Sequence, residues 1–326
     1  MVNMMKNALS RPCNLCDSIT FDVLSIRGRE GEYLRTVICK ECGLVWSDPF
    51  PLDPTEYYQK DYRILYKGTY SPKIKHIYRA ANVAIARYNR LKHYLAGTQR
   101  VLEIGSGGGE FAYLLGQKGF QVSAIEPNEG YGNYSKTQYG IDVQIGFAQN
   151  LDFPVQSFDF ITMSHVLEHV DNPTTVLRKL NIWLKEGAIL ALEVPNVEAV
   201  CQSPKNTFHA AHLFNFNQAT LSKLVEKTGF SVLKTFLSSD GGNITLITRK
   251  ETALSLTPLF SISGNYEKIS GKVQSHTALT HYFSPFPYLR LIGKIPRLLE
   301  ERKATSTFSE AKQVLDACYA KLLTHS

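Results

Sequence analysis

The 326-residue sequence has no run of 18 apolar residues, so it offers no candidate for a helix that crosses a membrane. Its first residues, MVNMMKNALSRP, lack the apolar stretch of a secretory signal. The formal net charge is +7, but lysine and arginine form no dense runs of the kind that nucleic-acid-binding proteins carry. We therefore expect a cytoplasmic protein that binds no nucleic acid. The modest positive charge suits an anionic small molecule or a membrane surface.

Only two of the six cysteines, Cys201 and Cys318, lie after residue 42, which excludes a disulfide framework for most of the chain. The other four cysteines form two C-x-x-C pairs with 22 residues between them, Cys13/Cys16 and Cys39/Cys42. This spacing is typical of a zinc ribbon, in which four thiolates on two tight turns complete a tetrahedron. The intervening segments ITFDVLSI and EYLRTVI alternate well enough for short strands. The sequence predicts a structural Zn²⁺ with no open coordination position.

From residue 100 to 250, apolar strands alternate with amphipathic helices, which predicts an α/β fold with a doubly wound, mostly parallel sheet. Seven strands are predicted, at 100–104, 120–125, 141–145, 158–163, 188–194, 230–237 and 243–250. The last two are joined by Ser-Asp-Gly-Gly, a hairpin signal, so the final strand should run antiparallel.

A glycine loop follows the first of these strands in VLEIGSGGG, residues 101–109. Glycines let the chain turn sharply and let a ligand lie against bare backbone. Glu126 ends the next strand, 21 positions after Gly105. An acid at this place accepts hydrogen bonds from ribose hydroxyls. The pattern predicts a nucleoside-cofactor site at the carboxyl edge of the sheet.

The charges around the loop indicate which cofactor it holds. A dinucleotide fingerprint needs glycine or alanine where this chain has Glu110, and Glu103 adds a second carboxylate. Two carboxylates repel a pyrophosphate and suit a ligand with sulfonium and ammonium groups. E-x-G-x-G-x-G, the strand-end Glu126 and the later FDFITMSHVLEHV segment together resemble class I S-adenosylmethionine-dependent methyltransferases, which have a Rossmann-like fold.

The resemblance implies a role for each residue at the sheet edge. Gly105 and Gly107 would approach the methionine part, Glu126 would hold the ribose, and Ala148-Gln149 would lie near the adenine. The full set of expected S-adenosylmethionine-binding residues is Glu103, Gly105, Ser106, Gly107, Glu126, Pro127, Asn128, Ala148, Gln149 and Ser164.

Histidines are the candidate bases for a hydroxyl acceptor, because their unperturbed pKa lies near neutrality. His165 and His169 lie in SHVLEHVDNP, directly after the fourth strand, and His212 lies in FHAAHLFNF. The second segment resembles Y-H-E-H-L-x-Y-F of zinc-containing sugar methyltransferases, in which the histidine before leucine is the proposed base. Ala211 replaces the glutamate of that segment, which counts against C-methylation of a keto-sugar.

The N-terminal cysteine module followed by this core resembles methyltransferases of sugar and surface-polysaccharide pathways. The resemblance implies O-methylation of a sugar or a nucleotide-linked glycan. Methylation of a lipid or another small molecule, sugar C-methylation and, less favoured, RNA methylation are the alternatives.

The predicted organisation is a zinc ribbon over 1–50, a tyrosine-rich arm and linker helix over 51–97, a core over 98–250 and a helical extension over 251–326. The linker helix is predicted to start at Ser71-Pro72, with a solvated polar face. The extension contains a basic apolar stretch around residues 286–303, and its last helix has one apolar face. We expect it to dock on the core. Peripheral membrane contact and homodimerisation are the alternatives.

Overall fold

The structure is a computed structural model that describes residues 10–50, 73–251 and 261–324. The chain divides into two compact units, each assembled from separate stretches of sequence. The first comprises residues 1–54, 165–181 and 192–288, and the second comprises 55–164, 182–191 and 289–326. The predicted domain boundaries after residues 50, 97 and 250 stay a prediction. The predicted tyrosine arm, with Tyr57, Tyr58, Tyr62, Tyr66 and Tyr70, and the predicted helix start at Ser71-Pro72 lie outside the described residues.

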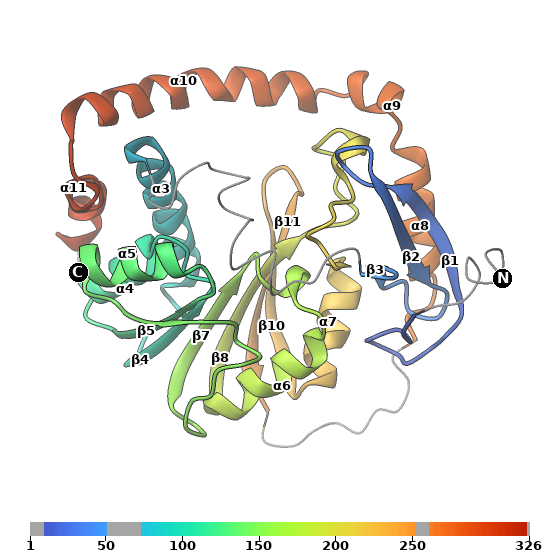
Figure 1. The fold of residues 1–326 in the computed structure, drawn as a ribbon, viewed down its shortest axis with the longest axis horizontal. Coiled ribbons are helices and arrows are strands. Elements are labelled where there is room, and N and C mark those ends of the chain that lie inside the picture. Colours follow the sequence, from blue (N-terminus) through green and yellow to red (C-terminus); the bar gives the residue numbers. More distant parts are fainter. Residues whose placement is uncertain (1–9, 51–72, 252–260, 325–326) are drawn as a thin grey trace. The chain divides into compact units, whose positions relative to one another are not determined.

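The central sheet has seven strands in the order β10-β11-β8-β7-β4-β5-β6, which can be followed in Figure 1. Their bounds are β4 Arg100–Ile104, β5 Gln121–Glu126, β6 Asp142–Ile145, β7 Phe158–Ser164, β8 Leu184–Pro195, β10 Phe230–Leu237 and β11 Asn243–Lys250. β4 pairs in parallel with β5 and β7, and β5 pairs in parallel with β6. β10 and β11 form an antiparallel hairpin. The predicted fold class and the direction of the terminal hairpin are confirmed.

The strand that differs most from its prediction is β8, which begins at Leu184 instead of residue 188. Its first residues, Leu-Lys-Glu-Gly, are mostly polar and carry no alternating pattern. The backbone nevertheless continues the strand, because sheet pairing and not local hydrophobicity decides where a ladder ends.

In the second unit, helices surround the strands β4 to β6. Their bounds are α3 Ile74–Leu91, α4 Glu110–Gln117, α5 Glu129–Tyr139 and α11 Ala311–Leu323. The C-terminal helix α11 lies beside α3 and α4 (Figure 1). The Tyr319 hydroxyl donates to the carbonyl of Glu110 at 2.8 Å, and the Tyr113 hydroxyl donates to Asp316 at 2.6 Å. The predicted apolar helix at the C-terminus is therefore present, and it docks on neighbouring helices as expected.

The first unit contains a second, four-stranded sheet in the order β1-β2-β3-β9. Its strands are β1 Phe21–Arg27, β2 Tyr33–Cys39, β3 Val45–Ser47 and β9 Phe214–Asn215. The first two match the predicted ribbon strands. β3 pairs antiparallel with β9, so a segment 167 residues or more further along the chain completes the ribbon sheet. Nothing in the local sequence predicted β9.

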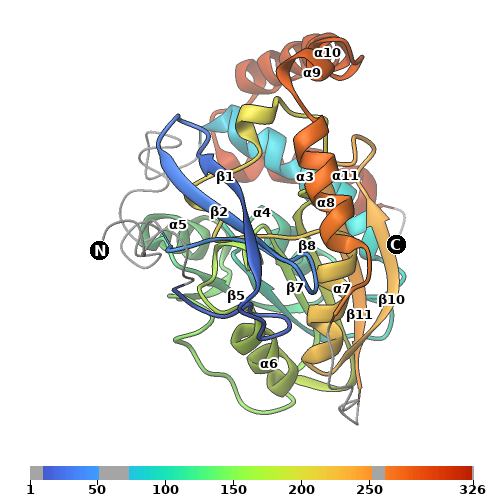
Figure 2. The same ribbon diagram turned by 90° about the vertical axis from the view of Figure 1, so that its right-hand side faces the viewer.

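The first unit also contains helices, of which α8 contacts β2 of the second sheet. Their bounds are α6 Pro173–Trp183, α7 Gln218–Lys227, α8 Asn265–Ser275 and α9 Ala278–Tyr282, with short 3-10 helices at Leu167–His169 (η2) and Pro204–Asn206 (η3). Figure 2 shows α8 running along the ribbon strands. Its Ile269 is fully buried with Leu34, Ile38 and Val45. Burial of these side chains holds α8 to the ribbon.

The remaining helix, α10, spans Phe286–Thr307 and includes Pro296. Several large apolar side chains in and before it are exposed, among them Phe283, Ile292 and Leu299. Within the described ranges, no helix combines the length and the hydropathy that a membrane crossing requires.

Candidate active site

The glycine loop after β4 adopts backbone angles that side chains disfavour. Gly105, Gly107 and Gly109 have φ of 74°, 58° and 86°. A Cβ added at Gly109 would come within 2.8 Å of Ser135 Oγ and Ile141 Cδ1. Glycine is required here because the loop is both left-handed and tightly packed at the start of α4.

Glu126 ends β5 and lies behind this loop, almost fully buried. Its Oε2 accepts a hydrogen bond from the Gly107 amide at 2.7 Å, and its Oε1 accepts one from the Asn128 amide at 3.0 Å. Each carboxylate oxygen has a second lone pair, so the side chain keeps capacity for hydroxyl donors. Asn128 also caps α5, because its side chain accepts from the amide of Tyr131. Glu126 and Asn128 therefore couple the glycine loop to the next helix.

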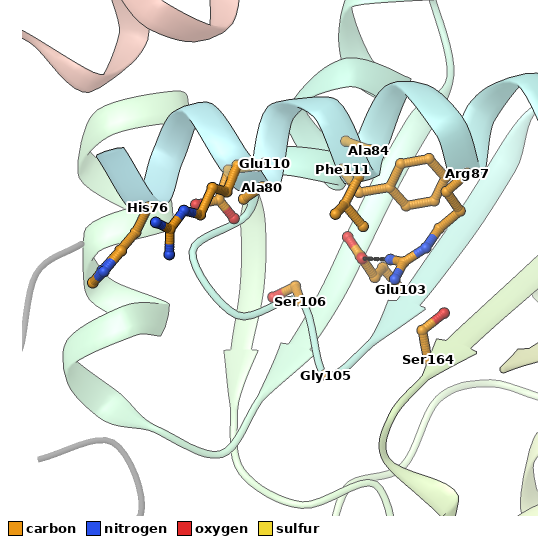
Figure 3. A pocket seen from close by; sticks show the side chains of 12 residues that line it. His76, Ala80, Ala84, Arg87, Glu103, Gly105, Ser106, Glu110, Phe111 and Ser164 are labelled. Carbon is orange, nitrogen blue, oxygen red and sulfur yellow. Dashed lines mark hydrogen bonds and ion pairs between the residues drawn. The ribbon is translucent and has the colours of Figure 1, made fainter. Parts of the chain in front are cut away.

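A cavity of about 490 Å³ lies beside the loop, within the second unit. Its walls come from α3, the end of β4, the loop, the first turn of α4 and the end of β7 (Figure 3). Four of the predicted cofactor residues line it: Glu103, Gly105, Ser106 and Ser164. The other six do not line it: Gly107, Glu126, Pro127, Asn128, Ala148 and Gln149. The roles of all ten stay a prediction.

The cavity wall supplied by α3 was not foreseen. His76, Arg79 and Arg87 line the cavity from this helix, although the sequence favoured a solvated polar face. Figure 3 shows Arg87 directed at Glu103, and the two side chains form an ion pair at 3.4 Å. Arg79 is engaged with Glu301 instead. No sequence signal could place α3 over the loop, because the contact is tertiary.

Glu103 is the most perturbed acid of the cavity. Burial raises its pKa to about 8, with Glu110 adding to the shift, while the Arg87 guanidinium opposes it. Among the described residues, no group forms a hydrogen bond with Glu103 Oε2 or with Ser106 Oγ. Buried polar atoms of this kind need a partner. An S-adenosylmethionine molecule, which brings cationic and hydrogen-bonding groups, fits this cavity chemically.

Glu103→Gln is expected to flatten the pH dependence of folding stability. Between the ordinary pKa of 4.5 and about 8, the folded protein keeps a proton that the unfolded chain loses. The free energy of unfolding should therefore fall with rising pH in this window, by up to about 1.4 kcal/mol per pH unit from this group. Urea unfolding of the variant at pH 5, 6, 7 and 8 should show a smaller decline than the unmodified protein. The control variant Glu129→Gln, at an exposed position, should keep the pH dependence of the unmodified protein. If Glu103→Gln also kept that pH dependence, the raised pKa of Glu103 would be contradicted.

The four N-terminal cysteines converge as predicted. Their sulfur atoms all lie within 4.8 Å of one another, with 3.5 Å between Cys13 and Cys42 and 3.4 Å between Cys16 and Cys39. None of the four forms a disulfide. Zn–S bonds of about 2.3 Å give tetrahedron edges of about 3.8 Å, so the cluster fits a Zn²⁺ ion. Cys201 and Cys318 lie outside it.

The two cysteine turns are anchored to helices of the same unit. Lys227 Nζ, at the end of α7, donates to the carbonyls of Asn14 and Leu15 at 3.0 and 2.8 Å. The Asn265 side chain at the start of α8 donates to the carbonyl of Cys42 at 2.8 Å. The cysteine module is therefore built into the first unit through hydrogen bonds to both turns.

The candidate base His165 directly follows β7 and has a φ of 56°. This left-handed conformation is uncommon for a residue with a side chain, and such strain clusters at functional sites. Its Nδ1 lies 3.4 Å from Glu168 Oε1, and its Nε2 lies 3.4 Å from Glu193 Oε1. Burial alone would lower the His165 pKa, but the two carboxylates outweigh it and raise the pKa above its ordinary value. His165 therefore holds its proton more firmly than a free histidine.

His169 and His212, which are 43 positions apart in sequence, lie side by side in the fold. Their ring centroids lie 4.9 Å apart, and His209 lies 5.4 Å from His212. Burial lowers the pKa of both His169 and His212; the His165 ring adds to the shift of His169, and the His169 ring adds to the shift of His212. Both are therefore neutral at pH 7. The structure brings the three predicted histidines into one cluster, and it adds Glu168 and Glu193, to which the sequence gave no role.

Comparison with known proteins identifies a family match for the central part of the chain. Residues 76–235 match the family described as "Methyltransferase domain". A probable S-adenosylmethionine-dependent methyltransferase of Mycolicibacterium smegmatis is 29% identical over 149 residues, which cover 44% of this chain and 56% of that protein. A ubiquinone biosynthesis O-methyltransferase of Xanthomonas euvesicatoria is 31% identical over 123 residues, covering 36% of this chain and 51% of that protein. The chain thus spans about half the length of these curated relatives.

Among solved structures, a SAM-dependent methyltransferase from Archaeoglobus fulgidus is similar to this chain with a TM-score of 0.46 and 20% identity. The match covers 58% of this chain and all of that one. A SAM-dependent methyltransferase from Thermotoga maritima, described as a possible histamine N-methyltransferase, has a TM-score of 0.45 and 22% identity, over 60% of this chain and 98% of that one.

Proposed function

We propose that this chain, whose residues 76–235 form a methyltransferase domain, is an S-adenosylmethionine-dependent methyltransferase that acts on a hydroxyl group. The observation that carries the proposal is the left-handed glycine loop with Glu126 behind it and a cavity beside it that Glu103 and Glu110 help to line. Bound S-adenosylmethionine supplies an electrophilic methyl group on a sulfonium. Glu126 would accept from the ribose hydroxyls, and Glu103 would face the cationic groups. Four cysteines would hold a structural Zn²⁺.

The histidine cluster is proposed to handle the acceptor proton. A hydroxyl attacks more readily when a nearby group takes its proton, and neutral imidazoles can do so. His169 and His212 meet this requirement at pH 7, because burial keeps both neutral. His165 follows in the chain directly after Ser164, which lines the cavity.

The acceptor is proposed to be a sugar or a nucleotide-linked glycan, on the likeness of the cysteine module and the FHAAHLFNF segment to sugar methyltransferases. Methylation of an apolar small molecule such as a quinol is the second candidate. It is favoured by exposed apolar side chains near α10, such as Phe283 and Ile292, and by relatives named as ubiquinone biosynthesis O-methyltransferases.

Methyl transfer from labelled S-adenosylmethionine tests both candidates. Purified protein is offered a panel of sugars and nucleotide sugars and, separately, a panel of quinols and catechols. Label on a sugar hydroxyl supports the first candidate, and label on a quinol supports the second. Donor binding without transfer to any hydroxyl in either panel would contradict the proposed acceptor class. Absence of donor binding would overturn the methyltransferase assignment.

His212→Ala is expected to lower kcat by about 100-fold or more, because general acid–base groups typically contribute 10²–10⁴-fold. Binding of S-adenosylhomocysteine, measured by calorimetry, should stay within about twofold, since no cofactor role is assigned to this residue. Exposed His93→Ala serves as the control and should retain full activity. Unchanged kcat in His212→Ala would show that this histidine serves packing alone.

A further inference from the structure

A second cavity lies in the first unit, where α8 ends and α9 begins. Its volume is about 190 Å³, well above the roughly 10–15 Å³ that a single water molecule requires. Among the described residues that line it, none is acidic. Six are polar or basic, and all six belong to the first unit: Lys272, Ser275, His276, Thr280, His281 and Ser284. The lining is therefore basic, with no acid to balance it.

Two imidazoles of this lining have buried nitrogen atoms that need a partner. The ring centroids of His276 and His281 lie 5.5 Å apart, and His281 is 6% exposed. No described residue forms a hydrogen bond with His276 Nε2 or with His281 Nδ1, and both atoms are buried. Polar atoms in such places are normally hydrogen-bonded. A neutral imidazole has one N–H donor and a protonated one has two, so the pair can donate to a bound acceptor.

Lys272 indicates the sign of the charge that such a ligand carries. Among the described residues, no carboxylate forms an ion pair with it, whereas Lys268, one turn earlier in α8, lies 2.9 Å from Glu198 Oε2. Burial lowers the pKa of His276, and the charges of His281 and Lys272 lower it further. The three groups therefore disfavour one another's positive charge. An anion between them would relieve this repulsion, and a cation would add to it.

The carbonyl groups at the end of α8, which would repel an anion, are already engaged. The Lys272 carbonyl accepts from the His276 amide at 3.2 Å and from Ser275 Oγ at 3.1 Å. The Ser275 carbonyl accepts from the Thr277 amide at 3.1 Å and from Thr280 Oγ1 at 3.0 Å. These bonds use the hydroxyl hydrogens of Ser275 and Thr280. The donors for a ligand therefore come from the two imidazoles and the ammonium group.

We propose that Lys272, His276 and His281 bind a phosphate group, at a site separate from the glycine loop and the cysteine cluster. Ammonium and imidazolium groups form strong, charge-assisted hydrogen bonds with phosphate oxygens. Zn²⁺ suits the cavity less well, because it takes four protein ligands in a structural site and three in a catalytic one. The described lining offers it two histidines, with no cysteine and no carboxylate. Phosphate binding here does not depend on the proposed methyl transfer.

Calorimetric titration of the full chain with inorganic phosphate, at pH 6 and constant ionic strength, tests the site. Lys272→Gln should weaken phosphate binding by about 10-fold or more, because a charge-assisted hydrogen bond is lost. Lys272 is exposed at the end of a helix, so this variant should fold normally. Lys268→Gln removes the same charge one turn away, outside the cavity lining, and should keep Kd within about twofold of the wild type.

A second titration, with uridine diphosphate, distinguishes the source of the phosphate group. Tighter binding than that of inorganic phosphate, again weakened in Lys272→Gln, assigns the site to a nucleotide. Binding no tighter than that of inorganic phosphate assigns it to the free ion.

NMR titration of the His276 imidazole provides a readout that needs no variant. Saturating phosphate should raise the pKa of His276, because a bound anion stabilises the imidazolium form. His281→Gln should weaken phosphate binding by a factor similar to that of Lys272→Gln, with a thermal unfolding curve to show that it folds. Absence of phosphate binding to the wild type, or equal Kd in the wild type, Lys272→Gln and Lys268→Gln, overturns the proposal.

Discussion

Glu126→Ala is expected to weaken the binding of S-adenosylhomocysteine by about 100-fold or more. A hydrogen bond to a charged acceptor contributes about 1.5–3 kcal/mol, and the ribose offers two hydroxyl donors to this carboxylate. A loss of about 3 kcal/mol corresponds to a factor of more than 100 in Kd. The substitution also removes the acceptor of the Gly107 amide, so the glycine loop loses a buried partner. Isothermal titration calorimetry measures the effect directly.

The matched control is Glu129→Ala. Glu129 is an exposed acid three residues further along, at the start of α5. It has no assigned contact with the cofactor, so its removal should change Kd by less than about twofold. A thermal unfolding curve shows whether Glu126→Ala still folds cooperatively. A folded Glu126→Ala protein with unchanged Kd would show that the nucleoside does not use this carboxylate.

Cys42→Ser is expected to remove the bound zinc and to lower the midpoint of thermal unfolding by about 5–10 °C. Structural zinc contributes on the order of 10 kcal/mol of binding free energy in small zinc-binding peptides, and part of it stabilises the surrounding fold. Cys42 also lies against α8, since its carbonyl accepts from Asn265. Melting curves and elemental analysis of the same samples connect the two effects.

Cys318→Ser provides the control for general loss of a thiol. Cys318 is half-buried in α11 and takes no part in the four-cysteine cluster. Its replacement should leave the zinc content unchanged and shift the midpoint by about 2 °C at most, as expected for a small change at a semi-exposed position. Retention of zinc by Cys42→Ser would contradict four-thiolate ligation.

The parts of the fold that were predicted from sequence are those encoded locally. Strand β4 and the hairpin β10–β11 have the predicted bounds, because each is a continuous apolar or alternating run that ends at a turn signal. The two cysteine turns were predicted for the same reason. By contrast, β9 consists of only two residues, and it is a strand because β3 lies beside it. Pairing partners that lie far apart in sequence leave no local pattern.

The residues of the candidate site can be divided in the same way, into those identified from a local pattern and those whose role depends on tertiary contacts. The glycine loop, Glu126 and the cysteines were identified because their chemistry depends on spacing within a short segment. Arg87 was missed because its role depends on α3 lying against the loop. Glu168 was given no role, because its place beside His165, His169 and His212 becomes visible only in the fold.

The pairing of β3 with β9 limits how the protein can be shortened. A chain that begins after residue 50 would lose β1, β2 and β3 together, and β9 would become an open strand edge next to His212. Exposed edges with unpaired amides and carbonyls invite association between molecules. The apolar residues of α8 that now cover the ribbon, such as Ile269, would be exposed as well. Trimming the N-terminus to obtain a minimal enzyme should therefore give a protein that aggregates and whose loop around His212 is disordered.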